Sequence, residues 1–304
     1  MDVLGDRISR LTDRVETLRA EYAAVADAGV LPSETARQSW DAIHVDPDDK
    51  QRLVNQALMT LGLRGQVPEA QLPLHGIIVL VGPPGTGKTT LARGLGHPIA
   101  TTLGAPMVYL EINAHKLGSG ALGKTQKQVD GLFSETIPAA IDDDYALIVF
   151  DEVEVLATAR AKLSLDANPI DVHRAVDAAL VGIDRLAREH PKALIVATSN
   201  FESAIDEALL SRADLVMTVP RPDLNGRKLI LRDTLEAVSR IQALDHLLRP
   251  EVIERVAIAA DGIDGRQLRK AVAGAIARRR ETVEDIRRLT EDDLITTVKE
   301  VLER

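Results

Sequence analysis

The segment Gly82-Pro83-Pro84-Gly85-Thr86-Gly87-Lys88-Thr89-Thr90 has the spacing G-x-x-x-x-G-K-T. Glycines in these positions let the backbone turn tightly, so that several N–H groups point at one anion. Lys88 would neutralise the outer phosphates of a nucleotide, and the Thr89 hydroxyl would bind Mg²⁺. A β-branched run precedes the segment and a helical pattern follows it, which disfavours the alternative of an ordinary turn. The sequence therefore predicts a Walker A loop that binds ATP and Mg²⁺.

Two carboxylates end a later apolar run. The stretch 146–150 is followed by Asp151 and Glu152, which the end of a parallel strand would place beside the phosphate loop. We expect Asp151 to hold Mg²⁺ and Glu152 to act as general base on the attacking water. Acids at strand ends are also common turn residues, so this Walker B assignment depends on its pairing with the Walker A loop. Asn200 follows another apolar run and is predicted to contact the terminal phosphate or the water, although asparagine also favours turns.

Two arginines are candidates for contacts with phosphate. Arg212 follows a short helical stretch and could be supplied to the nucleotide of a neighbouring subunit as an arginine finger. The alternative is a surface ion pair with Asp214. Arg266 begins a helix near the end of the chain and could reach the phosphates from a second domain, with Arg269, one turn further on, as the alternate.

Continuous apolar runs between helical patterns must position these groups. Such runs predict strands buried on both faces, over 77–81, 108–112, 146–150, 193–198 and 216–219. Their alternation with helices indicates an α/β fold with a parallel five-stranded sheet flanked by helices. After Pro220 only helical patterns remain, over 227–243, 250–260, 265–279 and 291–302. We therefore predict an N-terminal helical segment (1–36), a large nucleotide-binding domain (37–220) and a small helical lid domain (221–304).

The N-terminal segment carries a heptad-like pattern. Apolar residues recur at spacings of three and four, which predicts a helix over 7–28, at Ile8, Leu11, Val15, Leu18, Tyr22 and Val25. This helix either docks on its own domain or pairs with a partner or another subunit. Residues 29–36 are interpreted as a break after it.

The composition of the chain limits the kinds of partner that it is expected to bind. The formal net charge is −9 and aromatic residues make up 2% of the 304 residues, which argues against general binding of nucleic acids or membrane surfaces. There is no cysteine, no apolar signal core at the N-terminus and no apolar run of ~18 residues. We expect a cytoplasmic protein.

Taken together, these spacings resemble those of AAA+ ATPases, and in particular the pachytene-checkpoint remodellers, also called thyroid receptor-interacting proteins. The likeness runs from about Trp40 to Ala275. The segments that carry it are Glu111-Ile112-Asn113-Ala114-His115, Asp151-Glu152-Val153-Glu154, Asn168-Pro169-Ile170-Asp171, Ala204-Ile205-Asp206-Glu207-Ala208, Ser211-Arg212-Ala213-Asp214 and Gly265-Arg266-Gln267-Leu268-Arg269-Lys270.

The resemblance implies a homo-oligomer, a hexamer in that family, which hydrolyses ATP to open or partly unfold HORMA-domain proteins. The short chain is similar to the bacterial members, which regulate CBASS anti-phage systems. By this resemblance, Lys88 and Thr89 belong to the phosphate-binding loop, and Asp151 and Glu152 act on the metal and the water. Asn200 is the first sensor, Arg266 the second sensor and Arg212 the arginine finger.

The resemblance also places a central pore loop at 118–123. Relatives often carry an aromatic pair there, whereas this chain has Gly120, Ala121 and Leu122. Leucine buries less apolar area than tryptophan and is not a rigid ring, which puts strong threading of a substrate in doubt.

Two other functions compete with the remodeller. One is an ATP-gated ring scaffold that binds a partner without unfolding it, which the missing pore aromatics favour. The other is a DNA-directed AAA+ loader, which the negative charge disfavours. The adenine pocket is assigned to Ile43-His44-Val45 only as a hypothesis.

Overall fold

The computed structural model describes residues 3–113, 116, 124–153, 169–201, 203 and 205–303. The chain divides into two compact units. The first contains Met1–Asp41, Pro47–Gly82 and Lys88–Thr218, and the second contains Ala42–Asp46, Pro83–Gly87 and Val219–Arg304. The second unit thus includes the middle of the predicted Walker A loop as well as the C-terminal helices.

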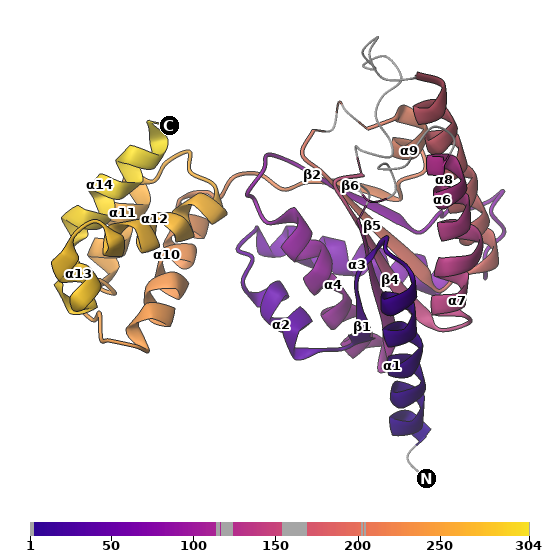
Figure 1. The fold of residues 1–304 in the computed structure, drawn as a ribbon, viewed down its shortest axis with the longest axis horizontal. Coiled ribbons are helices and arrows are strands. Elements are labelled where there is room, and N and C mark those ends of the chain that lie inside the picture. The colour runs from indigo at the N-terminus through magenta and orange to yellow at the C-terminus, as the bar shows by residue number, and fades with distance from the viewer. Residues whose placement is uncertain are drawn as a thin grey trace. The chain divides into compact units, whose positions relative to one another are not determined.

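A six-stranded sheet forms the centre of the first unit, in the order β1-β3-β4-β5-β2-β6 (Figure 1). Neighbouring strands from β3 to β6 pair in parallel, and β1 pairs antiparallel to β3. The strands are β1 (Val25–Leu31), β2 (Ile77–Val81), β3 (Met107–Asn113), β4 (Tyr145–Asp151), β5 (Ala193–Ser199) and β6 (Leu215–Thr218). The five parallel strands confirm the predicted α/β sheet, and the interior strand β2, between β5 and β6, is buried along its whole length.

The sixth strand corrects the interpretation of the N-terminal segment. The first helix, α1 (Val3–Glu21), ends before Val25, and residues 25–31 form β1 instead of the rest of a helix or a break. Its register runs from Val25 opposite Ile112 to Leu31 opposite Met107. Asp27, Ala28 and Gly29 have low strand propensity, so pairing with β3 overrides the local preference. Val25 continues the apolar spacing of the helix, but it is buried as a strand residue.

Helices cover both faces of the sheet (Figure 1). Leu11, Val15 and Leu18 of α1 are buried in the same core as the strands, so this helix docks on its own unit. That core lies on the face covered by α1, α6 (Lys124–Gly131), the π-helix Leu132–Thr136, α7 (Ile137–Ile141), α8 (Pro169–Glu189) and α9 (Glu207–Leu210). The opposite face carries α2 (Glu34–Asp41), α3 (Pro47–Leu63) and α4 (Lys88–Leu103).

After Val219, the regular elements among the described residues of the second unit are helices joined by loops, with a separate apolar core. Its helices are α10 (Leu224–Ser239), α11 (Pro250–Ala259), α12 (Gly265–Ala277), α13 (Arg280–Glu284) and α14 (Glu291–Leu302), with a 3₁₀ turn at Ile286–Arg288. Asp264 and Thr290 begin α12 and α14 with capping boxes, which satisfy N–H groups at the helix starts. Across the described part of the chain, no helix has the length and apolar character that crossing a bilayer requires.

Candidate functional site

The predicted Walker A loop joins β2 to α4, which begins at Lys88. Gly85 and Gly87 have φ values of +82° and +95°, a region that side chains other than glycine rarely adopt. A Cβ atom at Gly85 would also overlap the carboxylate of Asp264, and one at Gly87 would overlap Ile43. These glycines thus allow a turn whose N–H groups can surround an anion. Ile43, in the hypothetical adenine pocket, packs directly against this loop.

Lys88 is connected to the predicted base through Asn200. The Lys88 side chain is buried, and its Nζ donates to the carbonyl of Gly82 at 2.8 Å and to Oδ1 of Asn200 at 3.0 Å. The Asn200 amide nitrogen lies 3.4 Å from Oε1 of Glu152, to which it donates. The structure therefore brings together three residues that the sequence analysis assigned to one site, from the ends of three different elements.

Asp151 is the centre of a second set of contacts. Its Oδ1 accepts hydrogen bonds from the hydroxyls of Thr89 and Thr198, each at 2.6 Å. A hydroxyl and a carboxylate are oxygen ligands of the kind that Mg²⁺ prefers, so the predicted pair Thr89 and Asp151 fits this ion. We call Lys88, Thr89, Asp151, Glu152, Thr198 and Asn200 the edge cluster.

Glu152 has an unusual backbone conformation. Its φ is +55°, which is uncommon for a residue other than glycine and costs on the order of 1–3 kcal/mol. Its N–H donates to the Thr198 hydroxyl at 3.2 Å. The hydroxyl of Thr198 thus contacts both acids of the predicted Walker B pair and helps to hold Glu152 in this conformation.

Arg212 follows α9 and bonds to α8. Its Nε and Nη2 donate to the two carboxylate oxygens of Asp184 at 2.7 and 2.9 Å, and its Nη1 donates to the carbonyl of Ala208 at 2.8 Å. The alternative ion pair with Asp214 is wrong, because that carboxylate accepts the backbone N–H groups of His75 and Gly76 at 2.9 and 2.8 Å. We call residues 211–214 together with Asp184 the finger corner.

The second unit distinguishes the two candidate arginines of α12. Nη2 of Arg269 donates to the carbonyl of Ala42 at 2.8 Å, and its burial lowers its pKa. Arg266 is exposed, and its side chain makes no hydrogen bond within the described residues. Its backbone N–H donates to the carbonyl of Gly85 at 3.3 Å, which ties the start of α12 to the Walker A loop. These contacts favour Arg266 as the arginine that can reach a ligand.

The structure describes the other predicted loop residues but not the predicted pore loop. Pro83, Pro84, Thr86 and Thr90 lie in the loop and the first turn of α4, and the Thr86 hydroxyl donates to the carbonyl of Pro83 at 3.0 Å. The predicted pore-loop residues Gly120, Ala121 and Leu122 lie outside the described residues.

The sequence analysis assigned no role to Thr198 or Asp184. The register that places Ala197 opposite Phe150 also brings Thr198 beside Asp151, but this register is not visible in the sequence. Asp184 lies in an ordinary amphipathic helix and gives no local signal.

Comparisons with known proteins agree with this geometry. Residues 78–221 match the family described as "ATPase family associated with various cellular activities (AAA)". The chain is 43% identical over 272 residues to CD-NTase-associated protein 6 of Pseudomonas aeruginosa, covering 89% of this chain and 90% of that protein. It is 38% identical over 216 residues to a putative pachytene checkpoint protein 2 of Caenorhabditis elegans, where it spans about half of the relative's length, 51%.

Solved structures share the fold. A chain of the E. coli MS115-1 HORMA:CdnC:Trip13 complex superposes with a TM-score of 0.75 at 19% identity, over 91% of this chain and 95% of that one. C. elegans PCH-2 superposes with a TM-score of 0.66 at 25% identity, over 93% and 76%. The chain therefore belongs to the AAA family of ATPases, in the group of CD-NTase-associated protein 6 and the pachytene checkpoint proteins.

Proposed function

We propose that the chain is an ATP-hydrolysing ring subunit that opens HORMA-domain proteins and thereby regulates a bacterial CBASS anti-phage system. The observation that carries the hydrolytic part is the linked set Lys88, Asn200 and Glu152, which ends at a carboxylate held in a strained backbone conformation. A protein that only bound nucleotide would not need a base placed in this way. The near full-length likeness to CD-NTase-associated protein 6 supports the biological part.

The residues divide the hydrolytic work among them. The N–H groups of the Walker A loop bind the phosphates, and Lys88 exchanges Asn200 for a phosphate oxygen. Glu152 then takes the proton of the attacking water, which Asn200 orients through its amide. Thr89 and Asp151 would hold Mg²⁺, which neutralises charge on the phosphate oxygens when bound. We assign Arg266 to contact with the phosphates as well, since its side chain is exposed.

The proposal requires a neighbouring copy. Arg212 bonds to Asp184 and Ala208 of its own chain, so its described contacts are with α8 and α9 and not with the edge cluster. We assign it to the nucleotide of the next subunit, where an arginine stabilises charge on the transferring phosphoryl group. The assembly is a homo-oligomer, a hexamer by likeness to the family.

Substitution of Glu152 tests hydrolysis. In Glu152→Gln the amide cannot take up the proton of water, so we expect kcat to fall by roughly 10²–10⁴-fold while ATP still binds. Phosphate release and the binding of a fluorescent ATP analogue measure the two properties. Glu189→Gln, an exposed residue of α8, is the matched control and should hydrolyse at the parent rate. Parent-rate hydrolysis by Glu152→Gln would remove Glu152 from its assigned role.

A peptide-bound HORMA-domain protein tests the biological role. We expect ATP, but not a slowly hydrolysed analogue, to release the peptide held by its closed form, which a fluorescent peptide would report. The ATP-gated scaffold is the second candidate, because Ala121 and Leu122 replace aromatic residues in the predicted pore loop. It predicts that both nucleotides promote binding and that neither releases the peptide.

A further inference from the structure

Asp184 uses only part of the hydrogen-bonding capacity of Arg212. A guanidinium has five N–H donors, one on Nε and two on each terminal nitrogen. The contacts with Asp184 and Ala208 use Nε–H, one N–H of Nη2 and one of Nη1. One N–H therefore remains on each terminal nitrogen within the described part of the chain. Two such donors can bind a phosphate while the contact with Asp184 persists.

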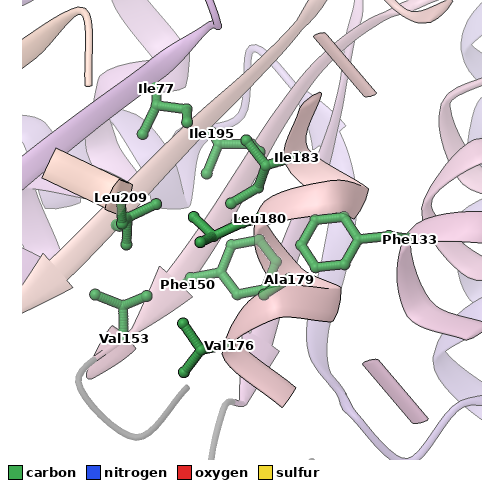
Figure 2. Close-up of a pocket in the computed structure, with 11 residues that line it drawn as sticks. Ile77, Phe133, Phe150, Val153, Val176, Ala179, Leu180, Ile183, Ile195 and Leu209 are labelled. Atoms are coloured by element: carbon green, nitrogen blue, oxygen red, sulfur yellow. The ribbon is translucent and has the colours of Figure 1, made fainter. Parts of the chain in front are cut away.

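Apolar packing holds α8 against α9, close to the two residues of this ion pair. Ile183, next to Asp184, and Leu209, three residues before Arg212, line the same small cavity of about 30 Å³ (Figure 2). The cavity's described lining is entirely apolar and also includes Phe150, whose ring stacks on that of Phe133 with centroids 5.7 Å apart. Both backbones are thus fixed by the core, which limits the distance over which the two polar side chains can separate.

Asp214 anchors the finger corner through contacts that do not involve the Arg212 side chain. Asp214 accepts the N–H groups of His75 and Gly76, which immediately precede β2, and its own N–H donates to the carbonyl of Ile77, the first residue of β2. Residues 211–214 are therefore tied to the sheet without any contribution from the Arg212 side chain. Asp184 is consequently not needed to hold this backbone, and its contact acts on the guanidinium.

We propose that Asp184 is a positioning residue, which holds Arg212 extended toward the nucleotide of the neighbouring subunit before that nucleotide arrives. The inference rests on the proposed function, because it assumes that Arg212 acts across the subunit interface. A long arginine side chain that is already ordered loses less rotamer entropy when it reaches the transition state. A bidentate contact also fixes the plane of the guanidinium, which a single hydrogen bond would not.

The ionisation of the pair is consistent with this role. The hydrogen bond from Arg212 holds the pKa of Asp184 below its ordinary value, and His75 and Arg188 nearby act in the same direction. Because the folded pKa is lowered, the pair is intact at neutral pH and is lost only as the pH falls through the carboxyl range. Both side chains are about a quarter exposed, at 25% and 27%, so a phosphate can approach.

Asp184→Asn tests the inference, since it keeps the shape of the side chain and removes its charge. We expect kcat to fall about tenfold, a fraction of the ~10³–10⁵-fold that a finger contributes, with unchanged ATP affinity. In an Arg212→Ala background the same substitution should have no further effect, because Asp184 acts through Arg212. Glu189→Gln is the matched control on the same helix. An unchanged or raised kcat, or an equal loss in the Arg212→Ala background, would overturn the proposal.

Hydrolysis by mixed rings distinguishes a positioning role from a merely structural one, because a structural role would give no rescue by a neighbouring subunit. Lys88→Ala subunits cannot bind ATP productively but retain Arg212 and Asp184. When they are mixed with Asp184→Asn subunits, we expect each Asp184→Asn site beside a Lys88→Ala neighbour to hydrolyse at the parent rate. Absence of this rescue would overturn the inference.

Failure of the proposed function gives a different pattern. If Arg212→Ala itself hydrolyses at the parent rate, the finger assignment is wrong and the positioning role falls with it. If Arg212→Ala is inactive but Asp184→Asn behaves as the parent, only the positioning role is wrong. Should Asp184→Asn fail to assemble, Asp184→Glu replaces it in both experiments. This variant keeps the charge but displaces it by one methylene, so a smaller loss with the same rescue is expected.

Discussion

The edge cluster and the finger corner hold their charged groups by different means. In the edge cluster the members bond to one another, and the Lys88 and Thr198 side chains are buried. In the finger corner Arg212 bonds to one carboxylate and one carbonyl and is about a quarter exposed. Anchoring of the corner is separate, through Asp214 and the backbone of His75 and Gly76.

Substitutions in the two regions should therefore have different consequences. Groups that satisfy one another in a buried network lose their partners together, so substitutions there should be strongly non-additive. A partly exposed ion pair contributes little to stability, so a substitution at Asp184 can change activity without changing the fold.

The largest expected effect is that of Arg212→Ala. Loss of the finger should lower kcat by ~10³–10⁵-fold with nucleotide binding retained, which phosphate release and ATP-analogue binding would measure. Mixing these subunits with Lys88→Ala subunits should restore part of the activity, because an intact site then meets an intact finger. Hydrolysis that stays proportional to protein concentration at high dilution would contradict an action across subunits.

Asn200→Ala examines coupling in the edge cluster. Removal of one donor aimed at the reacting groups should lower kcat by roughly 10²–10³-fold. In a Glu152→Gln background the same change should cost far less, because Asn200 contacts Glu152 directly. Asn55→Ala, an exposed residue of α3, is the control. Fully additive losses would show that the two side chains act separately.

Stability should distinguish the two carboxylates of the finger corner. Asp214→Ala leaves two backbone N–H groups without their acceptor and should lower the free energy of unfolding by about 2 kcal/mol. Asp184→Asn breaks a partly exposed ion pair and should cost less than ~1 kcal/mol. Urea denaturation of both variants measures this contrast, and equal losses would refute the separation of anchoring from positioning.

The smallest effect concerns the backbone of Glu152. Glycine adopts a φ of +55° without steric cost, so Glu152→Gly should be more stable than Glu152→Gln by about 0.5 kcal/mol after its entropic penalty. At the exposed helical residue Glu236 the same comparison should favour glutamine by about 1 kcal/mol. If both positions favour glutamine equally, the conformation of Glu152 stores no strain.

The sequence predicted the parallel sheet and the residues at its edge because both depend on local signals. Apolar β-branched runs indicate buried strands, and the acids and amide that follow them are adjacent in the chain to those runs. β1 was missed because Asp27, Ala28 and Gly29 give no strand signal and only pairing with β3 makes this segment extended. Thr198 and Asp184 were missed because their partners come from other strands and helices, and depend on register and packing. The alternative ion pair of Arg212 with Asp214 is not formed for the same reason, because the choice of Asp184 depends on how α8 packs.

The attachment of Gly85 to the first turn of α12 has a mechanical consequence. The carbonyl of Gly85 accepts the N–H of Arg266, and the Asp264 carboxylate fills the space where a side chain at Gly85 would be. Gly85 of the predicted phosphate loop is thus in contact with both the cap and the first residues of α12. A change of curvature at Gly85 would therefore displace the hydrogen bond to Arg266 directly and shift the start of α12.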